Sequence, residues 1–103
     1  MTEKKVLARV VVMNPQGLHA RPASLFVERA IQFESKIEII KNSERFDGKS
    51  ILEILGLAAV QGTELAIEAV GPDAEAALKA LTSLFEREFA EEEDLSNREG
   101  DPS

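Results

Sequence analysis

The sequence contains no cysteine, no tryptophan and no tyrosine, and it has a single histidine. Without cysteine, neither a disulfide framework nor a thiolate metal site can form. One histidine does not supply the ligands of an ordinary zinc site, so we expect no metal and no cofactor. No apolar run reaches the roughly 18 residues of a membrane span. The first apolar run carries Arg9 and is followed by no signal-peptide cleavage site, so we expect a soluble cytoplasmic protein without membrane insertion.

The acidic charge of the chain is concentrated at its C-terminal end. The 103 residues carry a net charge of −7, and residues 91–103 hold six acidic side chains against one basic side chain. The remaining residues are nearly balanced and lack the basic face that nucleic acids require, so we expect no nucleic-acid partner. We predict one domain over residues 1–90, followed by a disordered, solubilising tail over 91–103. A specific docking role is the alternative for the tail.

Apolar periodicity predicts seven elements. Alternating apolar residues indicate strands over 6–13, 36–41, 44–47 and 64–70. Three- and four-residue steps indicate helices over 20–32, 51–55 and 74–89. The β-α-β-β-α-β-α order favours an α+β fold, with three helices on one face of a four-stranded antiparallel sheet.

Local signals refine the predicted helices. The first helix presents an apolar face that includes Ile31. Ser50 and Glu53 have the spacing of a capping box, and Gly56 is the expected stop of that short helix. Asp73 is in position to cap the last helix.

His19 lies where the first turn leads into the first helix, within the stretch from Asn14 to Ala23. The first amides of that helix, at Ala20 and Arg21, and the positive end of its dipole favour an anion there. The guanidinium of Arg21 adds a fork of donors that suits phosphate oxygens. A histidine at this place can carry a phosphoryl group covalently. The alternative is that His19 is only a polar N-cap with a solvated arginine beside it.

Two motifs resemble those of a known family. Gly17-Leu18-His19-Ala20-Arg21-Pro22-Ala23 resembles the active-site signature of HPr, the histidine-containing phosphocarrier of the bacterial phosphoenolpyruvate:sugar phosphotransferase system. The stretch from Lys49 to Leu57, followed by Gln61-Gly62-Thr63, resembles the family's regulatory-serine segment. The separation of the motifs fits without a gap, and the resemblance spans residues 4–90. It implies the HPr-like open-faced β-sandwich.

The resemblance also implies a function. His19 would take a phosphoryl group on Nδ1 from phosphorylated enzyme I and give it to an enzyme IIA domain. Arg21 and the amides of Ala20 and Arg21 would hold the phosphate. The protein would be a monomeric, stoichiometric carrier in the cytoplasm and not an enzyme. Ser50 would be a substrate of HPr kinase/phosphorylase, and its alternative role is the helix cap alone.

The family's docking face is formed by the first helix and the short second helix. For Leu52 and Ile54, the alternative to a place on this face is a position in the hydrophobic core. Glu28 and Glu53 stand where many sugar-pathway members carry lysine or another non-acidic residue. These departures keep open a second function, a regulatory module of a nitrogen-type branch that binds kinases or transcription regulators according to its phosphorylation. An autonomous enzyme is not indicated, since no general acid, second base or metal set accompanies His19. The implied docking residues are Ala20, Ser24, Leu25, Glu28, Ile51, Leu52, Leu55 and Gly56.

Overall fold

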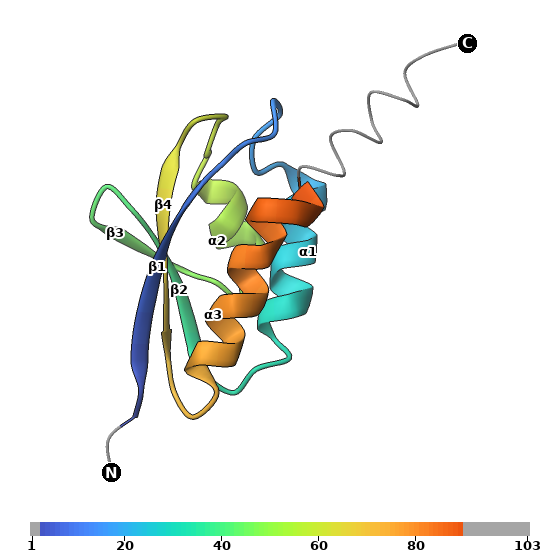
Figure 1. The fold of residues 1–103 in the computed structure, drawn as a ribbon. Helices are drawn as coiled ribbons and strands as arrows, with labels where there is room; N and C mark the ends of the chain where they lie inside the picture. The colour runs from blue at the N-terminus through green and yellow to red at the C-terminus, as the bar shows by residue number, and fades with distance from the viewer. Residues whose placement is uncertain (1–2, 90–103) are drawn as a thin grey trace.

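The computed structural model describes residues 3–89, and their arrangement is shown in Figure 1. The elements follow the predicted β-α-β-β-α-β-α order. The predicted tail over 91–103 lies outside the described residues. The elements are β1 (Lys5–Val11), α1 (Ala20–Ala30), β2 (Lys36–Lys41), β3 (Glu44–Asp47), α2 (Ile51–Gly56), β4 (Glu64–Val70), α3 (Ala74–Ser83) and η1 (Leu84–Glu88), a π-helical turn that continues α3.

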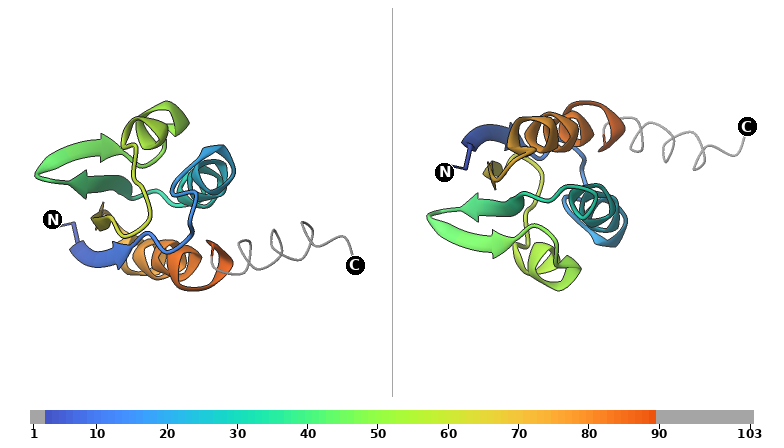
Figure 2. Two further views of the ribbon diagram at one scale, coloured as in Figure 1. Left: turned by 90° about the horizontal axis from the view of Figure 1, so that it is seen from above. Right: turned by 90° about the horizontal axis from the view of Figure 1, so that it is seen from below.

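The strands form one antiparallel four-stranded sheet in the order β1-β4-β2-β3. Ile67 of the inner strand β4 is aligned with Ala8 of β1 on one side and with Ile39 of β2 on the other. In Figures 1 and 2 the helices lie together against one face of this sheet. The predicted α+β open-faced sandwich is therefore confirmed.

Strand alternation decides which side chains form the core. Leu65, Ile67 and Ala69 of β4 are buried beneath the helices, as is Val10 of β1. Leu7 of β1 is exposed because its side chain points to the open face, as the period of two predicts. From the helical side, Phe26 of α1 and Leu81 of α3 close the same core. Burial of this apolar surface is the main stabilising term of the domain.

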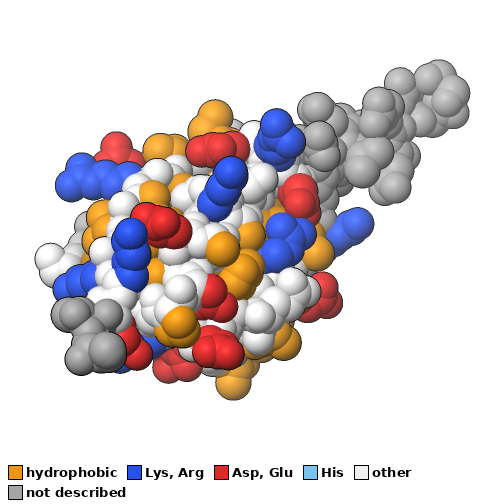
Figure 3. All heavy atoms as spheres, turned by 60° about the horizontal axis from the view of Figure 1, so that its bottom comes forward, with side chains coloured by type: hydrophobic (Ala, Val, Ile, Leu, Met, Phe, Trp, Pro, Cys, Tyr) orange, Lys and Arg blue, Asp and Glu red, His pale blue; other side chains and the backbone are white. Residues whose placement is uncertain are grey.

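Glu68 departs from the alternation that the sequence predicts. It lies on the open face of β4, yet only 6% of it is exposed. Arg45 of β3 and Lys5 of β1 lie over its carboxylate, with N···O distances of 2.8 and 3.5 Å. The hydrogen bond from Arg45 lowers the pKa of Glu68. Basic side chains of β1 and β3, the two edge strands, thus cover Glu68 with ion pairs. Acidic and basic side chains are also interspersed over the face seen in Figure 3.

At the helix C-termini the prediction for Ile31 is wrong, whereas α2 does end at the predicted Gly56 but without the expected left-handed glycine. Ile31 is 59% exposed, because α1 ends at Ala30 and the next residue has left the buried stripe. Gly56 does not stop α2 by turning left-handed. The chain continues through Leu57 and reverses at Ala58, whose φ is 51°. An alanine thus takes the left-handed conformation that glycine adopts most readily.

Asp73 is the N-cap residue of α3, as predicted, but its side chain does not cap the helix, since it makes no capping hydrogen bond. Its carboxylate instead accepts from the backbone N–H groups of Glu34 and Ser35, each at 2.9 Å, and from the Ser35 hydroxyl. Because Ser35 is buried, this link satisfies groups that water does not reach. Asp73 therefore ties the turn before β2 to the turn before α3.

D73A is expected to lower the melting temperature by several degrees at neutral pH, because the Ser35 donors lose their acceptor. The hydrogen bond from the Ser35 hydroxyl, followed by that from the Glu34 N–H, lowers the pKa of Asp73. A depressed folded pKa stabilises the fold above the unfolded pKa of about 3.9, and this contribution is lost as the pH falls through the folded value. The difference between the melting temperatures of D73A and wild type should therefore shrink as the pH falls below the unfolded pKa of about 3.9.

Glu75 provides the control for this acid dependence. It lies two residues further along and pairs with Lys4 at 2.8 Å, but both side chains are exposed. Exposed pairs contribute little, so E75A should melt close to wild type at every pH. A D73A deficit that stays constant down to acidic pH would contradict the assignment of the stabilisation to the charged carboxylate.

Candidate functional site

The turn before α1 is held against the loop that follows α2. Gly17 has a φ of 73°, and a Cβ there would approach the Ala59 carbonyl oxygen to 2.3 Å. The next N–H, of Leu18, donates to that same carbonyl at 2.9 Å. A glycine is needed at this position because no side chain fits between the two backbones. The close approach fixes the chain two residues before the histidine.

His19 is the N-cap residue of α1, as predicted. Its backbone is extended, with φ −85° and ψ −168°, and its carbonyl accepts from the Ala23 N–H at 3.0 Å. Its half-buried side chain makes no capping hydrogen bond, and α1 has no acidic residue in its first turn. An α-helix directs its first amide groups out of its N-terminal end, and in α1 these belong to Ala20 and Arg21. The imidazole thus lies at a helix end whose own side chains do not neutralise its dipole.

The second motif lies beside the first, because α2 and α1 are in contact. Ser50 is the N-cap of α2, and its hydroxyl accepts from the Glu53 N–H at 3.3 Å. The reciprocal half of the predicted capping box is missing. The Glu53 carboxylate accepts from the Asp47 N–H at 2.7 Å, and the Ser50 N–H donates to the Asp47 carbonyl. Ser50 is therefore a helix cap whose hydroxyl stands at the start of α2.

Most of the predicted docking residues are exposed, and the others are half-buried. Leu52 is 78% exposed, so its core alternative is wrong, whereas Ile54 is buried in the core. Val60 is exposed as well and had not been predicted as a surface residue, since it ends an apolar run. Ser24 and Leu25 are half-buried. The exposed members of the predicted set are Ala20, Glu28, Ile51, Leu52, Leu55 and Gly56.

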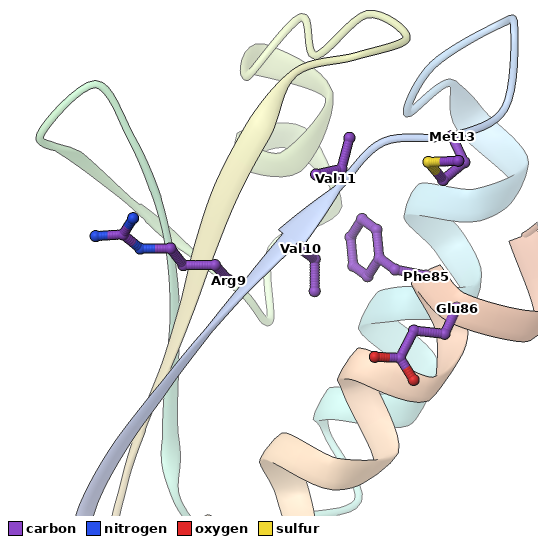
Figure 4. Close-up of a pocket in the computed structure, with 6 residues that line it drawn as sticks. All are labelled: Arg9, Val10, Val11, Met13, Phe85 and Glu86. Atoms are coloured by element: carbon purple, nitrogen blue, oxygen red, sulfur yellow. The ribbon is translucent and has the colours of Figure 1, made fainter.

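A separate apolar pocket of about 390 Å³ lies between β1 and η1. Figure 4 shows Val10, Met13 and Phe85 gathered there, with Arg9 pointing away. None of the residues that line it is a predicted site residue. Within residues 3–89, no three His, Asp or Glu side chains gather as a metal site would require. No helix of this region is long and apolar enough to cross a bilayer.

Comparison with known proteins agrees with this geometry. The family model described as PTS HPr component phosphorylation site matches residues 6–87. The phosphocarrier protein HPr of Treponema pallidum is 44% identical over 87 residues, which cover 84% of this chain and 99% of that protein. The match therefore includes the histidine turn, both motifs and nearly the whole of the relative.

Solved structures extend the similarity to the fold. A crystal structure of HPr from Thermoanaerobacter tengcongensis superposes with a TM-score of 0.75 at 41% identity, covering 84% of this chain and 96% of that one. An HPr dimer from the same organism gives a TM-score of 0.66 at 44% identity, covering 76% and 90%. Both the fold and the order of its elements are thus shared with these proteins.

Proposed function

The chain belongs to the HPr family of phosphocarrier proteins, and on this premise we propose that His19 accepts a phosphoryl group from phosphorylated enzyme I and passes it to an enzyme IIA. The observation that carries the proposal is the place of the imidazole. It stands at the N-cap of α1 without a capping hydrogen bond of its own, above a first turn that holds no acidic side chain. A helix end of this kind favours an anion bound at the ring.

The chemistry is an exchange of one N–P bond for another. The lone pair of His19 Nδ1 attacks the phosphorus of the donor phosphohistidine, whose N–P bond breaks and returns its electron pair to the donor ring. The amides of Ala20 and Arg21 and the guanidinium of Arg21 hold the phosphate oxygens while the phosphoryl group is transferred. Transfer to the enzyme IIA runs the same exchange in the other direction, so the protein is regenerated unchanged and acts as a stoichiometric carrier.

Incubation with enzyme I and phosphoenolpyruvate tests the proposal. The full chain should gain one acid-labile phosphoryl group by mass spectrometry, and an enzyme IIA should remove it. If the wild-type chain gains no phosphate from an enzyme I preparation that phosphorylates a known HPr, the proposed function is wrong.

We propose that partners dock on the exposed residues around this site. Ile51, Leu52 and Leu55 of α2 and Glu28 of α1 present apolar and acidic groups on helices that contact one another. Exposed apolar side chains of this kind are typical of protein-binding surfaces. The choice between sugar-type and nitrogen-type partners, the monomeric state and the cytoplasmic location stay predictions. The domain boundary at residue 90 and the role of the tail stay predictions as well.

Phosphorylation of Ser50 would regulate this docking surface. S50D is expected to melt near wild type, because aspartate caps a helix as well as serine does. It should raise the KM for enzyme I about tenfold through repulsion at the docking surface. S50A should instead lose about 1 kcal/mol of stability with the cap and accept phosphate normally. Thermal melts and enzyme I kinetics measure both quantities.

Asn42→Asp adds the same charge in the turn between β2 and β3 and serves as the matched control. Its φ of 51° suits aspartate as well as asparagine, so the fold should be unaffected. Equal KM values for S50D and N42D would show that Ser50 is a helix cap alone.

A further inference from the structure

Asn14 is a buried polar residue inside the turn that leads to His19. Only 5% of it is exposed. Its side-chain Nδ2 donates to the Gly17 carbonyl oxygen at 2.7 Å, and the Gly17 N–H donates back to the Asn14 carbonyl oxygen at 3.0 Å. Two hydrogen bonds therefore close the turn from Asn14 to Gly17, one through the backbone and one through the side chain.

The Gly17 carbonyl connects this turn to the histidine. The same oxygen accepts from the His19 N–H at 3.0 Å. Asn14 and His19 thus donate to one acceptor from two directions. Because that peptide group is fixed by Asn14, the backbone of His19 is fixed where it enters α1. The N–H of the same peptide unit, on Leu18, donates to the loop after α2. Both the C=O and the N–H of this peptide unit are therefore held by residues other than His19.

The orientation of the Asn14 amide follows from its neighbours. A carbonyl oxygen at 2.7 Å requires a donor, so Nδ2 faces Gly17. Oδ1 is then left buried without a hydrogen-bond partner among the described residues. A buried acceptor without a donor costs stability. Natural sequences accept such costs mainly at functional sites.

We infer that Asn14 is the positioning residue of His19, holding the imidazole and the first amides of α1 in register with each other for phosphoryl transfer. The inference rests on the proposed function, since it assigns a role within that same site. Asn14 does not touch the phosphate in this assignment. It acts through the Gly17 carbonyl and the His19 backbone.

N14A separates positioning from simple stabilisation. In this variant the Gly17 carbonyl keeps the His19 N–H as a donor, and the partnerless Oδ1 is gone. The loss of one hydrogen bond and the removal of one buried acceptor offset each other, so the melting temperature should change by only a few degrees. The turn, however, loses the hydrogen bond from the Asn14 side chain to the Gly17 carbonyl. Small displacements of a reacting group reduce rates strongly, so we expect the maximal transfer rate from enzyme I to fall about tenfold.

The kinetic readout is the split between KM and the maximal rate. KM should stay within about twofold of wild type, because the docking helices α1 and α2 are unchanged. L81V, a core substitution far along the chain in α3, is the control for lost stability and should leave the maximal rate unchanged. A wild-type maximal rate in N14A would overturn the inference. No phosphorylation of the wild type itself would instead overturn the proposed function.

A second measurement needs no enzyme I. Amide hydrogen exchange of the His19 N–H should become about tenfold faster in N14A, since the acceptor it binds is no longer braced. N14D provides a further test. The introduced carboxylate faces the Gly17 carbonyl with an acceptor in place of a donor, and exchange should be faster still. Unchanged exchange of the His19 N–H in both variants would overturn the inference even if the transfer rates had changed.

Discussion

H19A is expected to accept no phosphoryl group from phosphorylated enzyme I, because the only imidazole in the chain is removed. The variant should remain folded. The His19 side chain makes no capping hydrogen bond, so its truncation removes none. Mass spectrometry after incubation with enzyme I and phosphoenolpyruvate measures the loss, and circular dichroism confirms the fold. An acid-labile phosphate on H19A would contradict the assignment.

H19N sharpens this result. Asparagine is among the best N-cap residues, whereas the histidine here leaves the helix end without a side-chain acceptor. We therefore expect H19N to be more stable than wild type by about 0.5–1 kcal/mol in urea denaturation, yet equally unable to carry phosphate. A histidine that replaces a better helix cap at the cost of stability indicates that this position serves a chemical function. If H19N were less stable than wild type, the polar N-cap alternative would regain support.

Arg21 is the next residue in this test. R21A should keep a transferable phosphate but accept it about a hundredfold more slowly, on the order expected for loss of one donor to a developing charge. Arg9 provides the matched control. It lies on β1 and is not a predicted site residue, and R9A changes the net charge by the same amount as R21A. Equal rates for R21A and R9A would show that the arginine acts only through overall charge.

Local sequence patterns predicted the helices and strands, and long-range contacts explain where the structure differs from the prediction. The bounds of β2, β3 and β4 agree with the prediction because clean alternation or turn residues delimit each of them. Glu68 and Asp73 could not be predicted in the same way. Arg45 forms an ion pair with Glu68, and the turn before β2 donates hydrogen bonds to Asp73. Both partners come from segments far away in the sequence, and neither has a local signature.

The same distinction holds at the site. His19 and Ser50 could be placed at helix N-termini from sequence alone, because capping residues occur at a recognisable spacing. Asn14 could not be assigned a role, since an asparagine in a turn is usually exposed, whereas only 5% of Asn14 is exposed. A long-range contact with the loop after α2 explains Gly17. Its need for glycine comes from Ala59, a contact that no local rule predicts. The helices could thus be predicted from the sequence, but the Asn14 hydrogen bond and the Gly17–Ala59 contact could not.

F26A is expected to destabilise the domain by about 3–5 kcal/mol, the usual cost of emptying a large aromatic site in a core. Phe26 is 1% exposed, and its ring meets that of Phe85 edge to face at 6.1 Å. Phe85 in turn meets Phe89 at 5.0 Å, so the three rings join α1 to η1. A domain of this size has roughly 5–15 kcal/mol in total, and the variant would therefore approach the unfolding threshold. Urea denaturation measures the loss.

Two further variants are controls for this loss of stability, and F26A itself tests whether the core positions His19. F26L retains most of the buried volume and should lose less than half as much stability, whereas L52A, at an exposed position, should change it by less than about 0.5 kcal/mol. Phe26 lies in α1, the helix that His19 precedes, but the Gly17–Ala59 contact holds the turn before His19 without involving the aromatic rings. We therefore expect folded F26A, at low temperature, to accept phosphate at the wild-type rate. A slowed rate in fully folded protein would mean that the position of His19 depends on core packing as well as on the turn.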